Sequence, residues 1–443
     1  MQQETMFGHP KGLFVLFFTE MWERFSFYGM RAILVLYLTA LTTDEINPGL
    51  GWTSTEALAL YGWYGMFVYF MGIFGGAIAD KWLGQKKAVI VGGVLIILGQ
   101  FALTIHNMTM FYAGLVLLVC GVGLLKPNIS TMVGGLYPKG DGRRDAGFTL
   151  FYIGINIGAL AAPLLVGYFG EQVNWHLGFS LAGFGMIVGQ IVFVFGGKHL
   201  KDVGNLLKHS ETEAHLATQP LTKIEKDRVI VLLLSFLIVI VFWAAYEQAG
   251  GLMSLYARDS VDRMVWGFEV PTSWFQSLHA FYVVLIGVTV AGLWLKWGNM
   301  GKESSAIFKM AVGMIIMSIS FLALMGALYD ASINVLGKAP IYWLLFSYLL
   351  HVIAELSISP VALSFITKLA PTKYASLMMG AYFAIVGIGN KAAGLLGEAA
   401  QKAGEMAIFA IIAIACLLVG ILLFFLVKKL KALTHGAEEI TMV

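Results

Sequence analysis

Long apolar runs recur along the whole chain, with mostly short polar turns between them. Each is long enough for a transmembrane helix, which needs roughly 20 residues. The chain is 58% hydrophobic and 12% charged, whereas soluble domains carry about 25% charged residues. We therefore predict an all-α integral membrane protein with twelve helices. They begin near Gly12, Thr53, Lys86, Thr109, Ala146, Trp175, Arg228, Ser273, Ser304, Ala339, Thr372 and Glu405.

The distribution of positive charge predicts the topology. If the N-terminus is cytoplasmic, 21 of the 29 lysines and arginines fall in cytoplasmic loops and four in loops on the other side. This asymmetry fits the positive-inside rule with both termini cytoplasmic. We expect a multi-pass protein of the inner (plasma) membrane, surrounded by lipid bilayer. The net charge of +3 gives no reason to expect a nucleic-acid partner.

Cysteines and leader signals add little. Cys120 and Cys416 both lie in apolar runs, so we expect no disulfide. The first apolar run carries four charges and lacks a small-residue cleavage site, so we expect it to remain as the first helix. No metal or cofactor is predicted.

One polar segment, 196–227, divides the chain into halves at 1–195 and 228–443. The halves echo each other weakly: Lys126-Pro127-Asn128-Ile129-Ser130 in the fourth helix resembles Ser359-Pro360-Val361-Ala362-Leu363-Ser364 in the tenth. A parallel repeat of six plus six helices is the arrangement of the major facilitator fold, with the substrate site at the interface between the halves. Pro127 and Pro360 each free a backbone carbonyl and kink their helix, which predicts a conformational role.

A second motif supports that fold. Gly76-Ala-Ile-Ala-Asp80-Lys81-Trp-Leu-Gly84-Gln-Lys86-Lys87 resembles the major-facilitator signature between the second and third helices. Its glycines permit close helix approach. We expect Asp80 to bridge to neighbouring helix ends while Lys81 stays in the cytoplasm. An ordinary basic inside loop is the alternative interpretation.

The first predicted helix carries an unusual row of polar side chains. Glu20, Arg24, Tyr28 and Arg31 are spaced i, i+4, i+8 and i+11, so they share one face, and Glu23 lies beside them. An unpaired charge at the bilayer centre costs about 2.5–3.5 kcal/mol or more. This face must therefore look into the bundle or into a water-filled cavity. It indicates a transport path, although a purely structural pair of Glu20 and Arg24 is the alternative.

Other charges also fall inside predicted helices: Lys126, Glu247, Glu355 and Lys391. If these charges face one cavity, it suits a zwitterion with its carboxylate toward Arg31 and Lys126 and its ammonium toward Glu355. Glu23 and Glu247 could carry protons, because desolvation and neighbouring charges shift the affinity of a carboxylate for a proton. The alternative is that every charge is paired structurally.

Several motifs resemble the proton-dependent oligopeptide transporter (POT) family of the major facilitator superfamily. They cover nearly the whole chain in the family's order: Glu20-x-x-Glu23-Arg24-Phe25, Phe148-x-x-Phe151-Tyr152-Ile153-Gly154-Ile155-Asn156-Ile157-Gly158-Ala159, Trp243-x-x-x-Glu247-Gln248, Trp274-Phe275-Gln276-Ser277, Glu355-x-x-x-Ser359-Pro360, and Leu369-Ala370-Pro371 followed by Met378-Met379-Gly380. The resemblance implies a symporter that imports di- and tripeptides with protons by alternating access.

The resemblance also implies a role for individual residues. The proton-coupling group would be Glu20, Glu23, Arg24, Lys126 and Glu247. Tyr28, Arg31, Tyr69 and Lys126 would receive the peptide carboxylate. Asn156, Glu355 and Ser359 would hold the peptide backbone and amino terminus, and Trp243 would wall a side-chain pocket.

Three departures from the family pattern are notable. His279 stands where asparagine is usual, and we expect it to make peptide affinity depend on pH. Tyr382 replaces a common tryptophan, which would alter the pocket. Only about 32 polar residues, 196–227, separate the halves, so we predict that the two extra helices common in bacterial members are absent.

Three other functions compete with peptide symport. A symporter of a non-peptide anion or zwitterion, such as nitrate or an amino-acid conjugate, would use the same fold. An intramembrane enzyme is disfavoured because the chain has no His-Glu-x-x-His and no Gly-x-Ser-x-Gly motif. A nutrient receptor that does not transport would not need Glu20, Glu23, Arg24 and Lys126. The sequence does not define an oligomeric state.

Overall fold

The computed structural model describes residues 5–138, 141–206, 221–371 and 374–437. The elements of the amino-terminal part are β1 (Thr5–Met6), β2 (His9–Pro10), α1 (Lys11–Thr39), α2 (Ser54–Ile78), η1 (Ala79–Leu83), α3 (Gln85–Ala102), α4 (Met108–Gly135), α5 (Arg143–Ala162), η2 (Pro163–Gly167), α6 (Tyr168–Gln172), α7 (Trp175–Gly196) and η3 (Gly197–His199). They are followed by α8 (Lys223–Tyr246), η6 (Glu247–Gly250), α9 (Leu252–Ser260), β3 (Val261–Asp262), β4 (Met264–Val265), β5 (Phe268–Glu269), α10 (Trp274–Asn299), α11 (Ala306–Ile333), β6 (Ala339–Pro340), α12 (Ile341–Leu369), α13 (Ala375–Ala403) and α14 (Glu405–Leu433).

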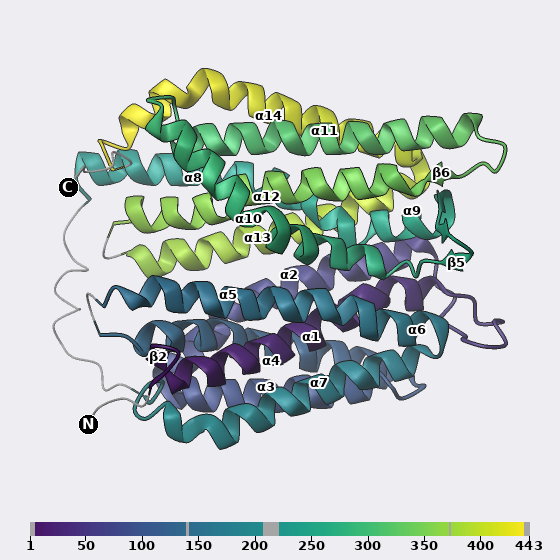
Figure 1. The fold of residues 1–443 in the computed structure, drawn as a ribbon, viewed down its shortest axis with the longest axis horizontal. Helices are drawn as coiled ribbons and strands as arrows, with labels where there is room; N and C mark the ends of the chain where they lie inside the picture. The colour runs from purple at the N-terminus through teal and green to yellow at the C-terminus, as the bar shows by residue number, and fades with distance from the viewer. Residues whose placement is uncertain (1–4, 139–140, 207–220, 372–373, 438–443) are drawn as a thin grey trace. The chain divides into compact units, whose positions relative to one another are not determined.

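Long helices make up nearly all of the described structure (Figure 1), and the six strands have two residues each. Within the described residues, eleven helices are long and apolar enough to cross a membrane. The first helix, α1, is not among them because Glu20, Glu23, Arg24 and Arg31 interrupt its apolar length. With α1 included, the described spans follow the order and approximate starts that the sequence predicts. The predicted helix start at Thr372 lies outside the described residues.

Two predicted helices are interrupted rather than continuous. The fifth span consists of α5, the π-helical turn η2 and α6, and the break begins at Pro163, which has no backbone N–H to donate. The seventh span changes from α8 to the 3₁₀ turn η6 and then to α9 at the pair Gly250-Gly251. Alternation of apolar runs does not reveal such breaks.

Side chains in the preceding turns define where several helices begin. Thr53 caps α2 in a capping box with Glu56, and Thr222 caps α8 in the same way with Glu225. Such boxes satisfy backbone N–H groups that have no partner inside the helix. The second box starts α8 at Lys223, earlier than the predicted start near Arg228.

The chain divides into two compact units. The first comprises the described residues of Met1–Lys208 and Met264–Phe281, and the second comprises those of His209–Arg263 and Tyr282–Val443. The segment Met264–Phe281, which includes the hairpin of β4 and β5, groups with the first unit, whereas our sequence division places it in the second half. The predicted boundaries at 195 and 228 stay a prediction. The prediction of no extra helices concerns a linker of which 207–220 lie outside the described residues.

The strands are short, with two residues each. β1 pairs antiparallel with β2, with Thr5 opposite Pro10. β4 pairs antiparallel with β5, with Met264 opposite Glu269. In the second unit β3 pairs parallel with β6, with Val261 opposite Ala339. These pairs connect helix ends and do not form a core.

Glycines allow the helices of the first unit to approach closely. A Cβ at Gly75 of α2 would overlap the backbone oxygen of Gly123 of α4. The backbone N–H that would normally bond this oxygen is missing at Pro127. Asn128 bridges the same crossing by donating to the backbone oxygens of Gly75 at 3.3 Å and Leu124 at 2.7 Å. Small residues of this kind let membrane helices pack backbone against backbone.

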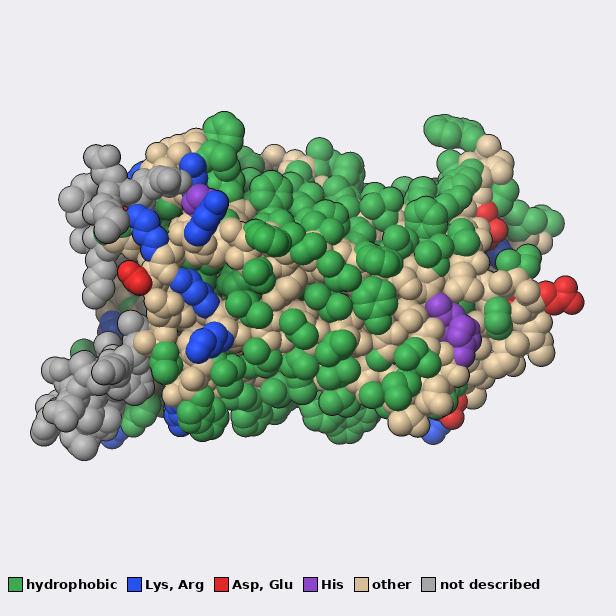
Figure 2. Space-filling view, turned by 90° about the horizontal axis from the view of Figure 1, so that it is seen from below, with side chains coloured by type: hydrophobic (Ala, Val, Ile, Leu, Met, Phe, Trp, Pro, Cys, Tyr) green, Lys and Arg blue, Asp and Glu red, His purple; other side chains and the backbone are tan. Residues whose placement is uncertain are grey.

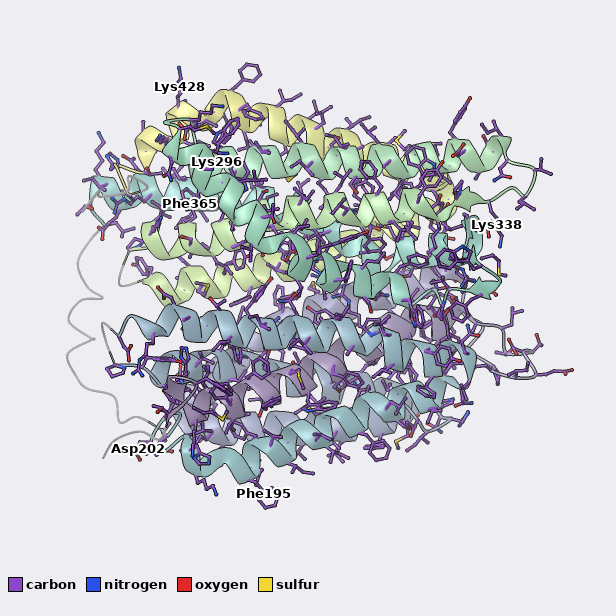
Figure 3. All side chains as sticks on the ribbon, in the orientation of Figure 1. Phe195, Asp202, Lys296, Lys338, Phe365 and Lys428 are labelled. Carbon is purple, nitrogen blue, oxygen red and sulfur yellow. The ribbon has the colours of Figure 1, made fainter. Side chains whose placement is uncertain are left out.

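Charge and apolar surface are distributed as a bilayer requires. Hydrophobic side chains cover the middle of the face in Figure 2, and Lys and Arg side chains gather near one end. In the second unit, Figure 3 shows Lys296 and Lys428 near one end of the helices and Lys338 at the other. This is the separation that the sequence predicts, although the cytoplasmic position of the termini stays a prediction. Lys139, Lys208 and Lys373, also counted for topology, lie outside the described residues.

Candidate functional site

The first polar cluster lies on α1 and consists of Glu20, Glu23 and Arg24. All three side chains are buried. Arg24 donates from Nε to Glu23, and the same nitrogen lies 3.2 Å from Oε1 of Glu20. The predicted face of α1 is therefore real, and it turns inward rather than toward lipid.

The three side chains of this cluster neither balance one another's charge nor satisfy all of their own hydrogen-bonding atoms. Two carboxylates and one guanidinium leave a formal charge of −1. Glu20 Oε2, Glu23 Oε1 and Arg24 Nη2 are buried and have no hydrogen-bond partner within the described part of the chain. A buried excess charge is costly unless it is balanced. Here it can be balanced by Lys126, which lies within electrostatic range of Glu20, or by a proton on one carboxylate. The second carboxylate therefore has two ways of being neutralised, by the Lys126 cation or by a proton.

Packing against α5 holds this part of α1. Gly158 and Gly154 lie four residues apart, and a Cβ at these positions would crowd the backbone oxygens of Met21 and Phe17, respectively. The glycines of the fifth-helix motif thus have a physical role, because they bring the α5 backbone against α1 beside Arg24. Asn156, on the same helix, is buried and donates to the backbone oxygen of Tyr152 at 2.9 Å.

Further along α1, Tyr28 and Arg31 continue the polar face. The guanidinium carbon of Arg24 lies 5.8 Å from the ring centre of Tyr28. Arg31 donates from Nε to the hydroxyl oxygen of Tyr61 at 2.7 Å and also contacts it through Nη2. Tyr61, on α2, was not among the predicted site residues.

The second cation of this unit also lies beside a tyrosine of α2. The ammonium nitrogen of Lys126 is 5.0 Å from the ring centre of Tyr69, within the usual range of a cation–π interaction. Lys126 precedes Pro127 inside α4. The structure thus brings the predicted pair Tyr69 and Lys126 together.

The loop motif after α2 forms the π-helical turn η1. Asp80 and Lys81 are exposed there, and Gly84 has φ of 76°, a conformation that favours glycine. The predicted bridge from Asp80 to other helix ends stays a prediction.

In the second unit, Glu247 is buried where α8 ends. Its neighbour Gln248 donates to the backbone oxygens of Ala244 at 2.9 Å and Ala393 at 3.1 Å. The Cβ of Trp243 fits against Gly389 of α13, where a Cβ would clash. Glu247 and Trp243 are therefore held by close packing of α8 on α13.

Glu355, Ser359 and Tyr382 form a second polar group in this unit. The hydroxyl of Tyr382 forms side-chain hydrogen bonds with Ser359 and with Trp243, and Glu355 lies within electrostatic range. Tyr382 is buried. Pro360 follows Ser359 inside α12.

Two other charged or titratable side chains of this unit have local partners. Lys391 forms an ion pair with Glu398 at 3.2 Å. Glu398 is not among the charges that we predict from the sequence to lie inside helices. His351 is buried and its Nδ1 lies 2.6 Å from the hydroxyl oxygen of Ser320. His351 is thus a core residue with a hydrogen-bond partner.

Comparison with known proteins identifies the family. Residues 86–222 and 207–414 match the sequence model described as POT family. The chain is 35% identical to a di-/tripeptide transporter of Lactococcus lactis subsp. cremoris over 492 aligned positions, covering 97% of this chain and 98% of the relative.

This chain belongs to the POT family.

Solved structures agree with this assignment. A peptide transporter POT in complex with alafosfalin is 35% identical, with a TM-score of 0.90, and covers 97% of each chain. A POT family transporter in complex with 5-aminolevulinic acid is 28% identical, with a TM-score of 0.88, covering 97% of this chain and 99% of that one. The major facilitator fold and a multi-pass position in the inner membrane are therefore confirmed.

Membership of the POT family places the chain among membrane transporters.

The L. lactis alignment spans 492 positions while this chain has 443 residues, so the relative has segments that this chain lacks. Within the POT pattern, Tyr382 stands where tryptophan is common. Its side chain has partners at this position, because its hydroxyl forms hydrogen bonds with Trp243 and Ser359. His279 is half-buried near the start of α10, and its effect on pH dependence stays a prediction.

One connection outside the predicted site organises the start of α10. The two carboxylate oxygens of Glu171, at the end of α6, accept hydrogen bonds from the backbone N–H groups of Thr272 at 2.7 Å and Ser273 at 2.8 Å. Ser277 adds a bond to the backbone oxygen of Leu160 at 2.9 Å. These contacts attach the first turns of α10, including His279, to the fifth span.

Proposed function

We propose that this protein is a proton-coupled symporter that imports di- and tripeptides by alternating access. The observation that carries the proposal is the buried cluster of Glu20, Glu23 and Arg24, in which a carboxylate can gain and lose a proton. The cluster holds two carboxylates beside one guanidinium, and the excess charge can be balanced by a proton or by Lys126, which lies within electrostatic range of Glu20. Names of relatives add support, because the L. lactis protein at 35% identity is a di-/tripeptide transporter.

The chemistry of the other charged side chains suits a peptide. Arg31 and Lys126 would receive the substrate carboxylate, since guanidinium and ammonium groups form strong charge-assisted hydrogen bonds with carboxylates. Glu355 would receive the ammonium group. Asn156 and Ser359 would bond the peptide backbone, and Trp243 with Tyr382 would bound a side-chain pocket.

Proton movement would start from the cluster on α1. When Glu20 or Glu23 is protonated, the formal charge of the cluster falls to zero and its burial is less costly. When it loses the proton, Arg24 is drawn more strongly to the carboxylates and is less available to other partners. Glu247 would serve as a further carrier, coupled to the Arg31 side. Protons are the only coupling ion that the proposal requires.

A second candidate is symport of a small non-peptide zwitterion. It is favoured by the neighbour at 28% identity that was solved with 5-aminolevulinic acid, which carries an amino group and a carboxylate but no peptide bond. Arg31 and Glu355 suit such a molecule as well as a peptide. Nitrate is less suited, because it has no ammonium group for Glu355.

Ligand binding distinguishes these candidates. We would measure the thermal unfolding midpoint of the purified protein in detergent with dialanine, trialanine, 5-aminolevulinate and nitrate, each titrated. Preferential binding stabilises a folded protein in proportion to the logarithm of ligand concentration over Kd. The proposal expects saturable stabilisation by dialanine and trialanine. Stabilisation by 5-aminolevulinate alone would favour the second candidate, and stabilisation by nitrate alone would contradict both.

A further inference from the structure

Tyr61 is the side chain that fixes the guanidinium of Arg31. Its hydroxyl oxygen accepts from Nε at 2.7 Å and contacts Nη2. The guanidinium carbon also lies 5.3 Å from the centre of the Tyr61 ring. Tyr61 is 4% exposed, so water competes little for its hydroxyl.

The contact uses a particular edge of the guanidinium. Arginine has five N–H donors in a rigid plane, and Tyr61 occupies the edge formed by Nε and Nη2. A carboxylate that Arg31 receives must then approach the edge formed by the two Nη atoms. The tyrosine therefore sets both the place and the orientation of that edge.

We propose that Tyr61 is a positioning residue that aims Arg31 at the carboxylate of the substrate. This inference rests on the proposed function, in which Arg31 receives that carboxylate. Tyr61 does not touch the substrate; it acts through Arg31. The gain comes from preorganisation, because a long side chain held in its binding geometry loses less conformational freedom when the ligand arrives.

A structural interpretation predicts something different. Tyr61 could simply tie α2 to α1, in which case its removal would weaken the fold and lower binding of every ligand alike. The positioning role instead predicts a loss that depends on the ligand's carboxylate and on Arg31. Two comparisons separate these interpretations.

The first comparison uses Tyr61→Phe, which keeps the ring and removes only the hydroxyl. Binding of dialanine and of dialanine amide would be measured by calorimetry on the full-length protein. We expect the variant to bind dialanine about tenfold more weakly, the scale of one hydrogen bond to a charged group. Binding of the amide, which has no carboxylate, should change less than about twofold, within the error of additivity.

Tyr64→Phe is the matched control. Tyr64 lies three residues along the same helix and is also 4% exposed. Its hydroxyl is buried and has no hydrogen-bond partner in the described part of the molecule. This variant should bind both ligands as the wild type does.

The second comparison repeats Tyr61→Phe in an Arg31→Ala background. If Tyr61 acts through Arg31, the added substitution should leave dialanine binding unchanged. An equal loss for dialanine and its amide, or a further tenfold loss without Arg31, would overturn the inference. A wild type that binds no peptide would instead overturn the proposed function, so the two failures are distinguishable.

Discussion

Nε of Arg24 lies 3.2 Å from Oε1 of Glu20, with both side chains buried within α1. One guanidinium is shared by two carboxylates in this arrangement, because the same nitrogen also donates to Glu23. The i, i+4 spacing brings Glu20 to Arg24, and Glu23 is the next residue in the chain to Arg24. Because all three side chains are buried, the free energy of the cluster depends on its total charge.

Arg24→Ala should be strongly destabilising. It leaves two buried carboxylates without their cation, and breaking a buried ion pair in this way costs about 3–5 kcal/mol. The thermal unfolding midpoint in detergent checks this. Arg143→Ala is a suitable control, because Arg143 pairs with Asp141 at an exposed position, where ion pairs contribute about 0–1 kcal/mol. Equal losses in the two variants would contradict the account of the cluster.

Gly158→Ala should displace α1 from α5. Its methyl group would overlap the backbone oxygen of Met21, and a backbone atom cannot move aside as a flexible side chain can. We expect a loss of about 1–3 kcal/mol, the usual cost of overpacking, measured as a lower unfolding midpoint. Gly72→Ala in α2, where a Cβ meets nothing within 4 Å, should be neutral or slightly stabilising. Normal stability of Gly158→Ala would show that the two helices can separate freely.

Glu171→Ala should loosen the start of α10. The substitution removes the acceptors of the Thr272 and Ser273 N–H groups, and loss of a helix N-terminal acceptor costs about 1 kcal/mol. Hydrogen exchange at these two amides should accelerate by several-fold, since about 1.4 kcal/mol is a factor of ten. Glu45→Ala, at an exposed loop position, is the control and should leave both amides protected. Unchanged exchange in Glu171→Ala would refute the role of this cap.

Asp141 tests whether a carboxylate outside the buried cluster contributes to the pH dependence of uptake. Hydrogen bonds from the side chain and backbone N–H of Arg143 lower the pKa of Asp141 to about 2. Because the pKa is lowered, the stabilisation is complete above the ordinary pKa of the carboxyl group and is lost only as pH falls through about 2.

Asp141 therefore keeps a constant charge between about pH 5 and 8. Asp141→Asn should leave the shape of the pH profile of peptide uptake unchanged over this range, measured in liposomes at fixed membrane potential. A profile that shifts in Asp141→Asn would mean that this loop carboxylate takes part in proton coupling.

Much of the fold follows from local sequence. Twelve apolar runs predict the helix order. They also predict a helix start near Thr53, where the structure has the capping box of Thr53 and Glu56. The equivalent signal at Thr222 and Glu225 is also present in the sequence, although periodicity alone places the helix start later. The ion pair between Lys391 and Glu398 is spaced seven residues apart, about two helical turns, and could have been predicted from that spacing.

Other features cannot be predicted from one sequence. Tyr61 is 30 residues from Arg31, and their contact depends on how α1 and α2 are rotated against each other. Glu171 caps a helix start about 100 residues away. Likewise, the sequence does not show that the backbone of α5 approaches α1 at Gly158, because the contact is with Met21, far away in the chain. These relationships arise from tertiary packing, which helix periodicity does not encode.

The central claim is that a proton exchanged at the buried cluster drives peptide uptake. The most direct measurement is accumulation of labelled dialanine in liposomes containing the purified protein, with and without an inward proton gradient, for wild type and Glu23→Gln. The account predicts gradient-driven accumulation by the wild type. It also predicts that Glu23→Gln loses this accumulation but retains exchange of labelled for unlabelled dialanine. Equal gradient-driven accumulation by Glu23→Gln, or wild-type uptake that ignores the gradient, would contradict it.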